Sequence, residues 1–323
     1  MKKFIICIIL LFVFIISGCR FLPDTSEQNT DKSTKTIENF NFDGTKRSFS
    51  VEHVPENIIV CGNNAADTLI AFGEGSKIST LILTNTYDKE KYTKALPQAK
   101  IYTASISQEA AIELKPDFIL AQRRFFDDKV LGNNMFWSNN GVMTTYIQDA
   151  SGPIPSLGNF PKCTIESEKN FISNMGKIFG KEDIANKLNK EIDDAVTIEN
   201  SINTLHPKVL VVEFINGNIE VFGKNLLSGD IITQLGGNII DYGYPFISLE
   251  KLMQSEADIV FVVYHGKDIE KNIALEKMND SVFHNIKAVK EGKVYPINYN
   301  DIVATGIHTA KTVNYIKEKL TSQ

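Results

Sequence analysis

The sequence has few of the residues that most often carry chemistry. Its 323 residues include one tryptophan, four cysteines and five histidines. It contains no G-x-S-x-G nucleophile elbow, no G-x-x-x-x-G-K-[ST] phosphate loop and no H-E-x-x-H zinc helix. These absences argue against an enzyme, and the scatter of the histidines gives little support for a zinc or manganese site with His and carboxylate ligands. The histidines are His53, His206, His265, His284 and His308.

An excess of positive charge is also missing. The chain has 34 basic and 39 acidic residues. Removal of residues 1–18, which hold two lysines, leaves 305 residues (323 − 18) with 32 basic residues (34 − 2) and a net charge near −7. We therefore expect no nucleic-acid partner. The hydrophobic content of 43% is ordinary for a globular protein, and the length suits two domains.

The first 18 residues have the pattern of an export signal. Two lysines precede an apolar stretch from Phe4 to Ile16, which is shorter than the roughly 20 residues that a helix needs to span a bilayer. The ending Ser17-Gly18-Cys19 resembles a bacterial lipoprotein signal, which implies that Cys19 becomes the diacylated first residue. An ordinary secretory signal is the alternative. Residues 19–37 are polar and predict a tether, because such a segment cannot bury enough apolar surface to fold.

One short segment occurs twice in the chain. A serine, a glutamate two residues later and an aspartate eight residues after that open an apolar run, first from Ser107 and again from Ser248. Each copy predicts a short helix, capped by the serine, that leads into a buried strand. The glutamates Glu109 and Glu250 are 141 residues apart (250 − 109), a spacing that suits two similar lobes. The alternative is the ordinary likeness of helix–strand units in α/β proteins.

Strands alternate with helices on both sides of a helical stretch. A hairpin is expected over residues 38–51 around Asp43-Gly44, and the alternation predicts an α/β fold with a parallel, doubly wound first lobe. The expected strands are 57–61, 78–83, 118–121, 142–147, 209–214, 219–222, 259–264 and 294–297. Besides the two repeat helices, the expected helices are 65–72, 230–235 and 308–320.

The segment from residue 164 to 206 carries only helical periodicity. Gly180 divides it, and the second helix, starting near Asp183 with a narrow apolar stripe that reaches Ile202, extends about 30 Å at 1.5 Å per residue. That length is enough to join two lobes. We therefore expect an N-terminal lobe at 38–163 and a C-terminal lobe at 207–323, linked by this backbone helix.

Four blocks of sequence, in order, resemble a known family. They are similar to segments of the class III substrate-binding proteins of ABC transporters, which deliver ferric siderophores, haem or cobalamin. The resemblance extends over nearly all of residues 38–320. The blocks are Val54–Val60 with Asp67–Gly73, Ser107–Ala121, Gln234–Asn238 leading to Glu250, and Ala288–Tyr295.

This resemblance implies two Rossmann-like lobes with a ligand cleft between them. It also implies that Glu109 and Glu250 dock onto arginines of a dimeric permease served by a cytoplasmic ATPase. One exposed carboxylate per lobe suits such a contact, since it sets the docking orientation. The alternative is that each glutamate only complements the terminus of its helix. We expect a monomer anchored by lipid on the outer face of the cytoplasmic membrane.

The loops after the expected strands hold the candidate ligand-binding residues, because ligands of open α/β sheets bind beyond the carboxyl ends of the strands. Arginines suit an anionic chelate, aromatic faces suit flat ligand groups, and His or Tyr can ligate iron. A ferric siderophore fits all three, although any of these residues can also be ordinary surface. They are Tyr87, Arg123, Arg124, Phe125, Tyr264, His265 and Tyr299.

A few positions distinguish a ferric siderophore from cobalamin and haem, the other ligands of this family. Cobalamin binders of the family carry tryptophans where this chain has Thr103 and Gln122, which disfavours cobalamin. Several haem binders carry an axial tyrosine at the position of Tyr102, although the arginine usual two residues later is Ala104 here. Haem therefore remains an alternative, with Tyr102 and His265 as candidate metal ligands and no intrinsic cofactor.

Three further questions stay open from the sequence. Trp137 packs the core of the first lobe or roofs the cleft, and we favour packing. Cys61 and Cys163 can form a disulfide outside the cell, but we interpret them as small apolar residues. A binding protein of this kind can also signal to a membrane sensor instead of feeding a transporter.

Overall fold

A computed structural model gives the structure of the protein. The chain divides at Ser33 into a short N-terminal unit and one compact unit from Thr34 to Gln323. Cys19, Tyr87 and the Asp43-Gly44 turn lie outside the described residues. In the part that is described, no helix has both the length and the apolar character needed to cross a membrane. The structure describes residues 35–41, 45–83, 88–147, 162–197 and 206–321.

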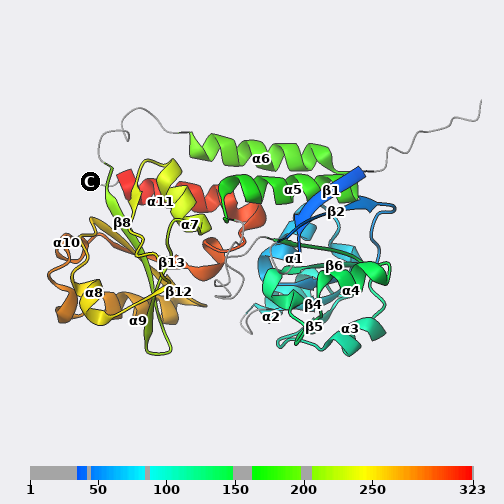
Figure 1. Ribbon diagram of the computed structural model, residues 1–323, viewed down its shortest axis with the longest axis horizontal. Helices are drawn as coiled ribbons and strands as arrows, with labels where there is room; N and C mark the ends of the chain where they lie inside the picture. Colours follow the sequence, from blue (N-terminus) through cyan, green and yellow to red (C-terminus); the bar gives the residue numbers. More distant parts are fainter. Residues whose placement is uncertain (1–34, 42–44, 84–87, 148–161, 198–205, 322–323) are drawn as a thin grey trace, which may run out of the picture. The chain divides into compact units, whose positions relative to one another are not determined.

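The first lobe is built on a parallel five-stranded sheet with the order β5-β4-β3-β6-β7, as the alternation of strands and helices predicts (Figure 1). The helices α2 and α4 and the short edge strand β5 are additional to the elements expected from the sequence. The strands are β3 (Ile58–Cys61), β4 (Ile78–Ile82), β5 (Lys100–Tyr102), β6 (Phe118–Gln122) and β7 (Met143–Ile147). The helices are α1 (Asn63–Ala71), α2 (Lys89–Ala95), α3 (Gln108–Glu113) and α4 (Asn134–Asn139).

The expected hairpin precedes this sheet. β1 (Lys35–Phe40) and β2 (Lys46–Val51) pair antiparallel, with Lys35 opposite Val51. β1 begins within the segment expected to be tether. Ile37 explains the earlier start, because its side chain is fully buried and contributes about the 1.5–3 kcal/mol typical of such burial.

Trp137 and the two cysteines lie inside the protein. Trp137 is 2% exposed, and its indole N–H donates to the carbonyl of Leu131 at 2.7 Å, so it packs the core as favoured from the sequence. Cys61 and Cys163 are both buried, and they do not form a disulfide with each other. Burial raises the pKa of Cys61, and Arg124 offsets only part of that effect. Both cysteines therefore behave as small apolar residues.

The second lobe holds a mixed sheet, not the fully parallel one of the first lobe. Its order is β11-β9-β8-β12-β13, and β10 also pairs with β8. β9 runs antiparallel to β8, because Asn216 and Gly217 both adopt positive φ (49° and 77°) and join the two strands in a tight hairpin. The strands are β8 (Lys208–Ile215), β9 (Asn218–Val221), β10 (Asn238–Ile239), β11 (Phe246–Ile247), β12 (Ile259–Tyr264) and β13 (Val294–Asn298). The helices are α7 (Leu227–Gln234), α8 (Leu249–Met253), α9 (Asp268–Met278), α10 (Lys287–Lys290) and α11 (Thr309–Thr321).

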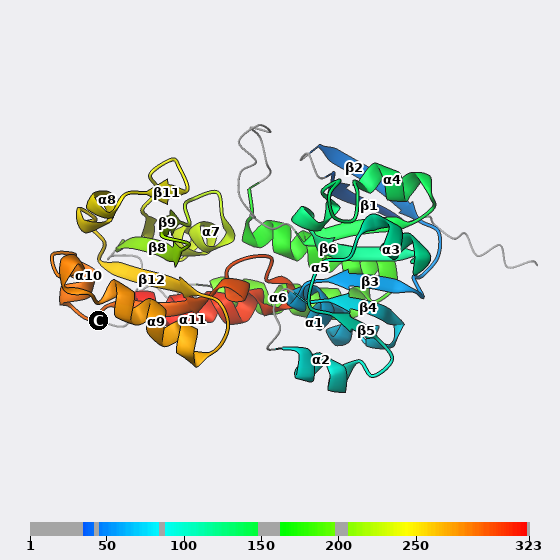
Figure 2. The same ribbon diagram turned by 90° about the horizontal axis from the view of Figure 1, so that it is seen from below.

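Two helices of 15 residues, α5 (Ile165–Phe179) and α6 (Glu182–Val196), form the crossover. Gly180 at φ 65° ends α5, and the chain turns back at once into α6. Each helix is about 22 Å long, shorter than the single helix of about 30 Å expected from the apolar stripe. α6 ends at Val196, and Ile202 lies outside the described residues. The crossing is therefore made by a packed helix pair, which Figures 1 and 2 show beside α11.

The doubled segment has the same structure in both lobes. Ser107 accepts a hydrogen bond from the backbone N–H of Ala110 and caps α3, and Ser248 caps α8 through Lys251 in the same way. The aspartate of each copy also makes the same hydrogen bond in its own lobe. The carboxylate of Asp117 accepts from the N–H of Asn57, and that of Asp258 accepts from the N–H of Lys208.

The backbone N–H of each aspartate also donates to the carbonyl of the same neighbour, Asn57 for Asp117 and Lys208 for Asp258. Each aspartate therefore fixes the start of the central strand of its sheet, β3 in the first lobe and β8 in the second. This shared role goes beyond the ordinary likeness of helix–strand units and supports two related lobes.

A second connection ties the lobes together. After β13 the chain passes through η4 (Tyr299–Asp301) and η5 (Gly306–His308) against α1 of the first lobe. The side-chain amide of Asn64 donates to two carbonyls of this segment, those of Asn300 and Ala304, at 2.8 and 3.0 Å. The buried carboxylate of Glu168 on α5 accepts from the N–H of Gly306 at 2.6 Å.

We expect Asn64→Ala to lower the free energy of unfolding by about 2 kcal/mol, because it leaves one buried and one partly buried carbonyl without their donor. Asn140→Ala is the matched control, since exposed Asn140 also donates to a backbone carbonyl, that of Phe136. Its effect should stay within about 0.5 kcal/mol. Urea unfolding of both variants measures the difference, and equal stabilities would contradict the importance of the Asn64 contacts.

Candidate functional site

We call the carboxyl ends of the strands of each sheet, with the residues that follow them, the candidate edge of that lobe. The candidate edge of the N-terminal lobe includes the point where the strand order of its sheet reverses. The chain runs from β3 to β4 and β5 on one side, and then to β6 and β7 on the other, so this point lies between β3 and β6. Ligands of open α/β sheets bind at such points. The sequence prediction placed Arg123, Arg124 and Phe125 directly after β6, and the structure confirms that location, in the short helix η2 (Arg123–Phe126).

These three residues differ in their exposure. Arg123 and Phe125 are buried, at 4% and 6% exposed. Arg124 is exposed, and its guanidinium carbon lies 5.4 Å from the centroid of the Phe125 ring, within the range of a cation–π contact. Of the two arginines, Arg124 therefore presents its charge to an incoming anion.

Two residues that the sequence did not single out as ligand-binding complete this edge. Gly62 follows β3 at φ 112°, a conformation that only glycine adopts easily. Gln122 ends β6 with its side chain buried, and its Oε1 has no hydrogen-bond partner among the residues that the structure describes. Leaving a buried polar atom unpaired costs about 1–3 kcal/mol. A polar ligand group at this edge would relieve that cost.

The second candidate edge belongs to the C-terminal lobe. β12 and β13 are parallel neighbours, and their last residues, Tyr264 and Asn298, lie opposite each other. The residues that directly follow the two strands, His265 and Tyr299, are therefore side by side. Their rings stack with centroids 4.5 Å apart and an interplanar angle of 23°. The imidazole Nε2 of His265 donates to Oε1 of Glu213 at 2.9 Å. The structure thus brings together two of the predicted residues and fixes the ring of one of them.

Glu213 and Glu220 form a carboxylate pair that was absent from the prediction. They lie directly opposite each other in the β8–β9 hairpin. Burial raises the pKa of Glu220, the charge of Glu213 raises it further, and His265 partly offsets both effects. The Asn216-Gly217 dipeptide was the signal that could have found this pair. A two-residue turn there places residues three before Asn216 and three after Gly217 opposite each other.

The remaining predicted residues are spread over both sheets. Tyr264 and His265 line a cavity of about 300 Å³ with Glu213 and Lys277, at the lower limit of ordinary small-molecule sites. Tyr102 is half-buried at the end of β5, the edge strand of the other sheet, with Nζ of Lys100 lying 4.9 Å from its ring centroid. The structure therefore does not bring Tyr102 beside His265. Among the described residues, no group of three His, Cys, Asp or Glu side chains forms a metal site.

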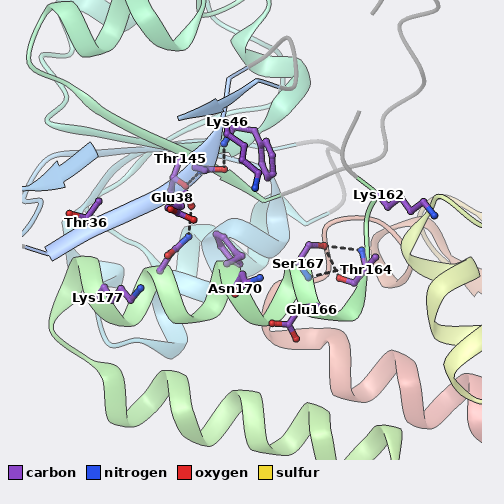
Figure 3. Close-up of a pocket in the computed structure, with 14 residues that line it drawn as sticks. Thr36, Glu38, Lys46, Thr145, Lys162, Thr164, Glu166, Ser167, Asn170 and Lys177 are labelled. Atoms are coloured by element: carbon purple, nitrogen blue, oxygen red, sulfur yellow. Dashed lines mark hydrogen bonds between the residues drawn. The ribbon is translucent and has the colours of Figure 1, made fainter. Parts of the chain in front are cut away.

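A larger pocket of about 570 Å³ lies between the hairpin and α5 (Figure 3). Both lysines and glutamates line it, including Glu38, Lys46 and Glu166. None of the predicted ligand-binding residues lines this pocket. We therefore place the candidate site at the strand ends instead.

The two glutamates of the repeat accept the same local hydrogen bonds. Hydrogen bonds from its own backbone N–H and from Ser107 lower the pKa of Glu109, and hydrogen bonds from its own N–H and from Ser248 do the same for Glu250. Both side chains are exposed, one in each lobe. Each lobe therefore presents one carboxylate that is ionised at neutral pH.

Comparison with known proteins places this geometry in a family. A sequence profile of the periplasmic binding protein family matches residues 58–299, which include both candidate edges and both glutamates of the repeat. The chain belongs to this family of extracytoplasmic binding proteins. No curated protein gives a significant match.

Solved structures show the same fold. A periplasmic binding protein from Veillonella parvula is 23% identical, with 89% of this chain and 91% of that chain covered at a TM-score of 0.74. An ABC-type Fe³⁺-hydroxamate transport protein from Saccharomonospora viridis is 16% identical, with 90% and 99% covered and a TM-score of 0.69. The petrobactin-binding protein YclQ from Bacillus subtilis is 18% identical, with 90% and 99% covered and a TM-score of 0.66.

We expect Glu220→Gln to stabilise the protein at pH 7 and to leave its stability unchanged at pH 4. Because the folded-state pKa of Glu220 is raised, folding disfavours its charged form, and that cost develops as the pH rises above the unfolded value of about 4.3. The melting temperature should rise by about 1–3 °C at pH 7 only. The exposed Glu276→Gln is the control, and an equal gain at both pH values would contradict the assignment.

Proposed function

We propose that this protein captures an iron complex outside the cytoplasm and delivers it to an ABC importer. The family match supports a binding protein, and the solved relatives of the same fold include proteins named for Fe³⁺-hydroxamate transport and for petrobactin binding. The single observation that carries the ligand class is the stacked pair His265 and Tyr299 at the ends of neighbouring strands. The ligand is a ferric siderophore.

The two strand edges offer complementary chemistry for such a ligand. Arg124 supplies a cation for an anionic chelate, and Tyr299 and His265 supply flat faces for aromatic groups. An imidazole nitrogen and a phenol oxygen are also ligands that Fe³⁺ accepts. Because Glu213 already holds Nε2 of His265, the nitrogen that faces an iron complex is Nδ1. Each lobe then contributes one wall of the cleft.

Haem is the second candidate, and Tyr102 is the observation that favours it. The side chain is half-buried at a strand end, where a phenol can serve as an axial ligand. A haem-binding protein from Roseiflexus is among the solved structures of this fold, at 16% identity and a TM-score of 0.59. Tyr102 and His265 are in different lobes, so they separate the two candidates experimentally.

Binding of purified protein to a panel of ferric siderophores and haemin tests the ligand class through quenching of intrinsic fluorescence. We expect at least one siderophore to bind and His265→Ala to weaken that binding about tenfold, or about 1.4 kcal/mol. His284→Ala is the matched control because it removes an exposed histidine elsewhere.

Two outcomes count against a siderophore. Quenching by haemin alone, with a Soret band that disappears in Tyr102→Ala, would assign haem as the ligand. No response to any member of the panel would reject an iron complex.

Delivery requires attachment at the membrane and recognition by the permease. A diacylated Cys19 and the polar residues 19–37 supply the anchor and tether in this proposal. Glu109 and Glu250 supply the docking contacts, because each is exposed, ionised and placed at the same point of its lobe. Matched carboxylates on two lobes suit arginines on the two subunits of a permease.

Reversing both charges should separate transport from binding. We expect Glu109→Arg with Glu250→Arg to lower uptake of radioactive iron complex by at least about tenfold, while ligand affinity changes less than about twofold. Glu113→Arg with Glu276→Arg is the control, since both are exposed helix glutamates outside the repeat positions. Unchanged uptake, or an affinity loss above about 1 kcal/mol, would reject the docking role.

A further inference from the structure

Exposed apolar side chains gather around one of the two glutamates. We name Tyr244, Phe246, Leu249 and Met253 the α8 patch. They are 53%, 51%, 46% and 37% exposed, and they lie within six residues of Glu250 in the sequence. Leu249 and Met253 are four residues apart on α8 and therefore share one face of that helix. Figure 1 shows this short helix in the C-terminal lobe, next to α10.

The repeat provides an internal comparison for this patch. The positions 141 residues earlier, counted from the equivalent capping serine, are Thr103, Ser105, Gln108 and Ile112. Only Ile112 is a large apolar residue, at 46% exposed. The side chain of Gln108 packs against Gly132, where a Cβ would come within 2.0 Å of its Nε2. The two lobes therefore display equivalent carboxylates in unlike surroundings, polar in the first and apolar in the second.

The apolar surroundings favour the pairing of the Glu250 carboxylate with a basic residue of a partner protein. Burial of the α8 patch by a partner would remove water from the carboxylate, and an ion pair strengthens as the local dielectric falls. Lys251, the next residue in the sequence, has its Nζ 5.2 Å from the centroid of the Tyr242 ring. The matching surface is therefore apolar and contains a basic residue.

The charge of Glu250 argues against two other partners that could cover the α8 patch, a second copy of this chain and a lipid surface. A second copy of this chain, bound through the same patch by a two-fold axis, would bring Glu250 opposite its own counterpart. Glu250 would repel anionic lipid headgroups and Lys251 beside it would attract them, so the patch offers no excess positive charge to an anionic membrane. We propose that the α8 patch docks with Glu250 on one permease subunit, and that this contact supplies more of the docking affinity than Glu109 does. This inference rests on the proposed docking function.

Exchange of three patch residues for their first-lobe counterparts tests the inference. The variant carries Tyr244→Thr, Phe246→Ser and Leu249→Gln. Val54→Thr, Met135→Ser and Ile269→Gln form the control variant, because these three apolar residues are exposed elsewhere. Binding is measured by biolayer interferometry to the permease and ATPase of the proposed importer, reconstituted in nanodiscs, in the absence of any iron complex.

We expect the patch variant to lose at least about tenfold in affinity for the permease, and the control variant less than twofold. Glu109→Arg should weaken docking less than Glu250→Arg does. The patch variant should keep the melting temperature and the ligand affinity of the wild type, since its side chains are half-exposed. A patch variant that binds the permease as the wild type does would overturn the inference.

Further measurements distinguish a failure of the proposed docking function from a failure of the inference about the α8 patch. If Glu250→Arg and Glu109→Arg also leave docking unchanged, the proposed docking function itself fails. If only the patch variant is without effect, the docking function stands and the inference falls. Dimerisation of the wild type in light scattering that the patch variant abolishes, or flotation of the unlipidated protein with phosphatidylglycerol vesicles, would assign the patch to a second copy or to lipid instead.

Discussion

The arrangement of the two lobes depends on how α1 holds the segment that follows β13. Asn64 binds two of its carbonyls, Glu168 binds the N–H of Gly306, and Asp67 accepts from Nε2 of His308 at 3.0 Å. Burial alone would raise the pKa of Asp67, but hydrogen bonds from His308 and Lys91, together with their charges, bring it below the ordinary value. The segment also holds Ala304 at φ 48°, which costs about 1–2 kcal/mol for an L-residue. These contacts offset that strain and join the end of one sheet to the first helix of the other lobe.

The same local devices recur in both lobes, while the strand edges differ. A serine cap and an aspartate that hydrogen-bonds to the backbone at the start of the central strand are structural requirements, and they recur in Ser107 with Asp117 and in Ser248 with Asp258. Because of these requirements, Glu109 and Glu250 occupy equivalent positions in the two lobes. The candidate edges are not fixed by the same structural requirements. One displays Arg124 over Phe125, and the other stacks His265 on Tyr299.

The sequence predicted the elements whose apolar pattern is strong and missed those that depend on tertiary contacts. β12 matches its expected range because Ile259–Tyr264 is a continuous apolar run. α2 was missed because only Tyr92 of its seven residues is buried, and α9 because only Ala274 and Met278 are buried. At the candidate site, His265 and Tyr299 were found because a strand end can be recognised locally. Glu213 and Gln122 were missed because their significance arises from burial, which one strand read alone does not show.

The C-terminal sheet connects the α8 patch to the candidate ligand edge. Phe246 of the α8 patch lies opposite Glu220 across β11 and β9, and Glu220 lies opposite Glu213 across β9 and β8. Glu213 in turn holds the imidazole of His265. Since paired residues in a β ladder share one face, these side chains form a row from an exposed apolar residue to a candidate iron ligand. Two strand pairs, β11 with β9 and β9 with β8, therefore separate Phe246 from the carboxylate that orients His265. The raised pKa of Glu220 marks the place in this row where the fold keeps a destabilising charge.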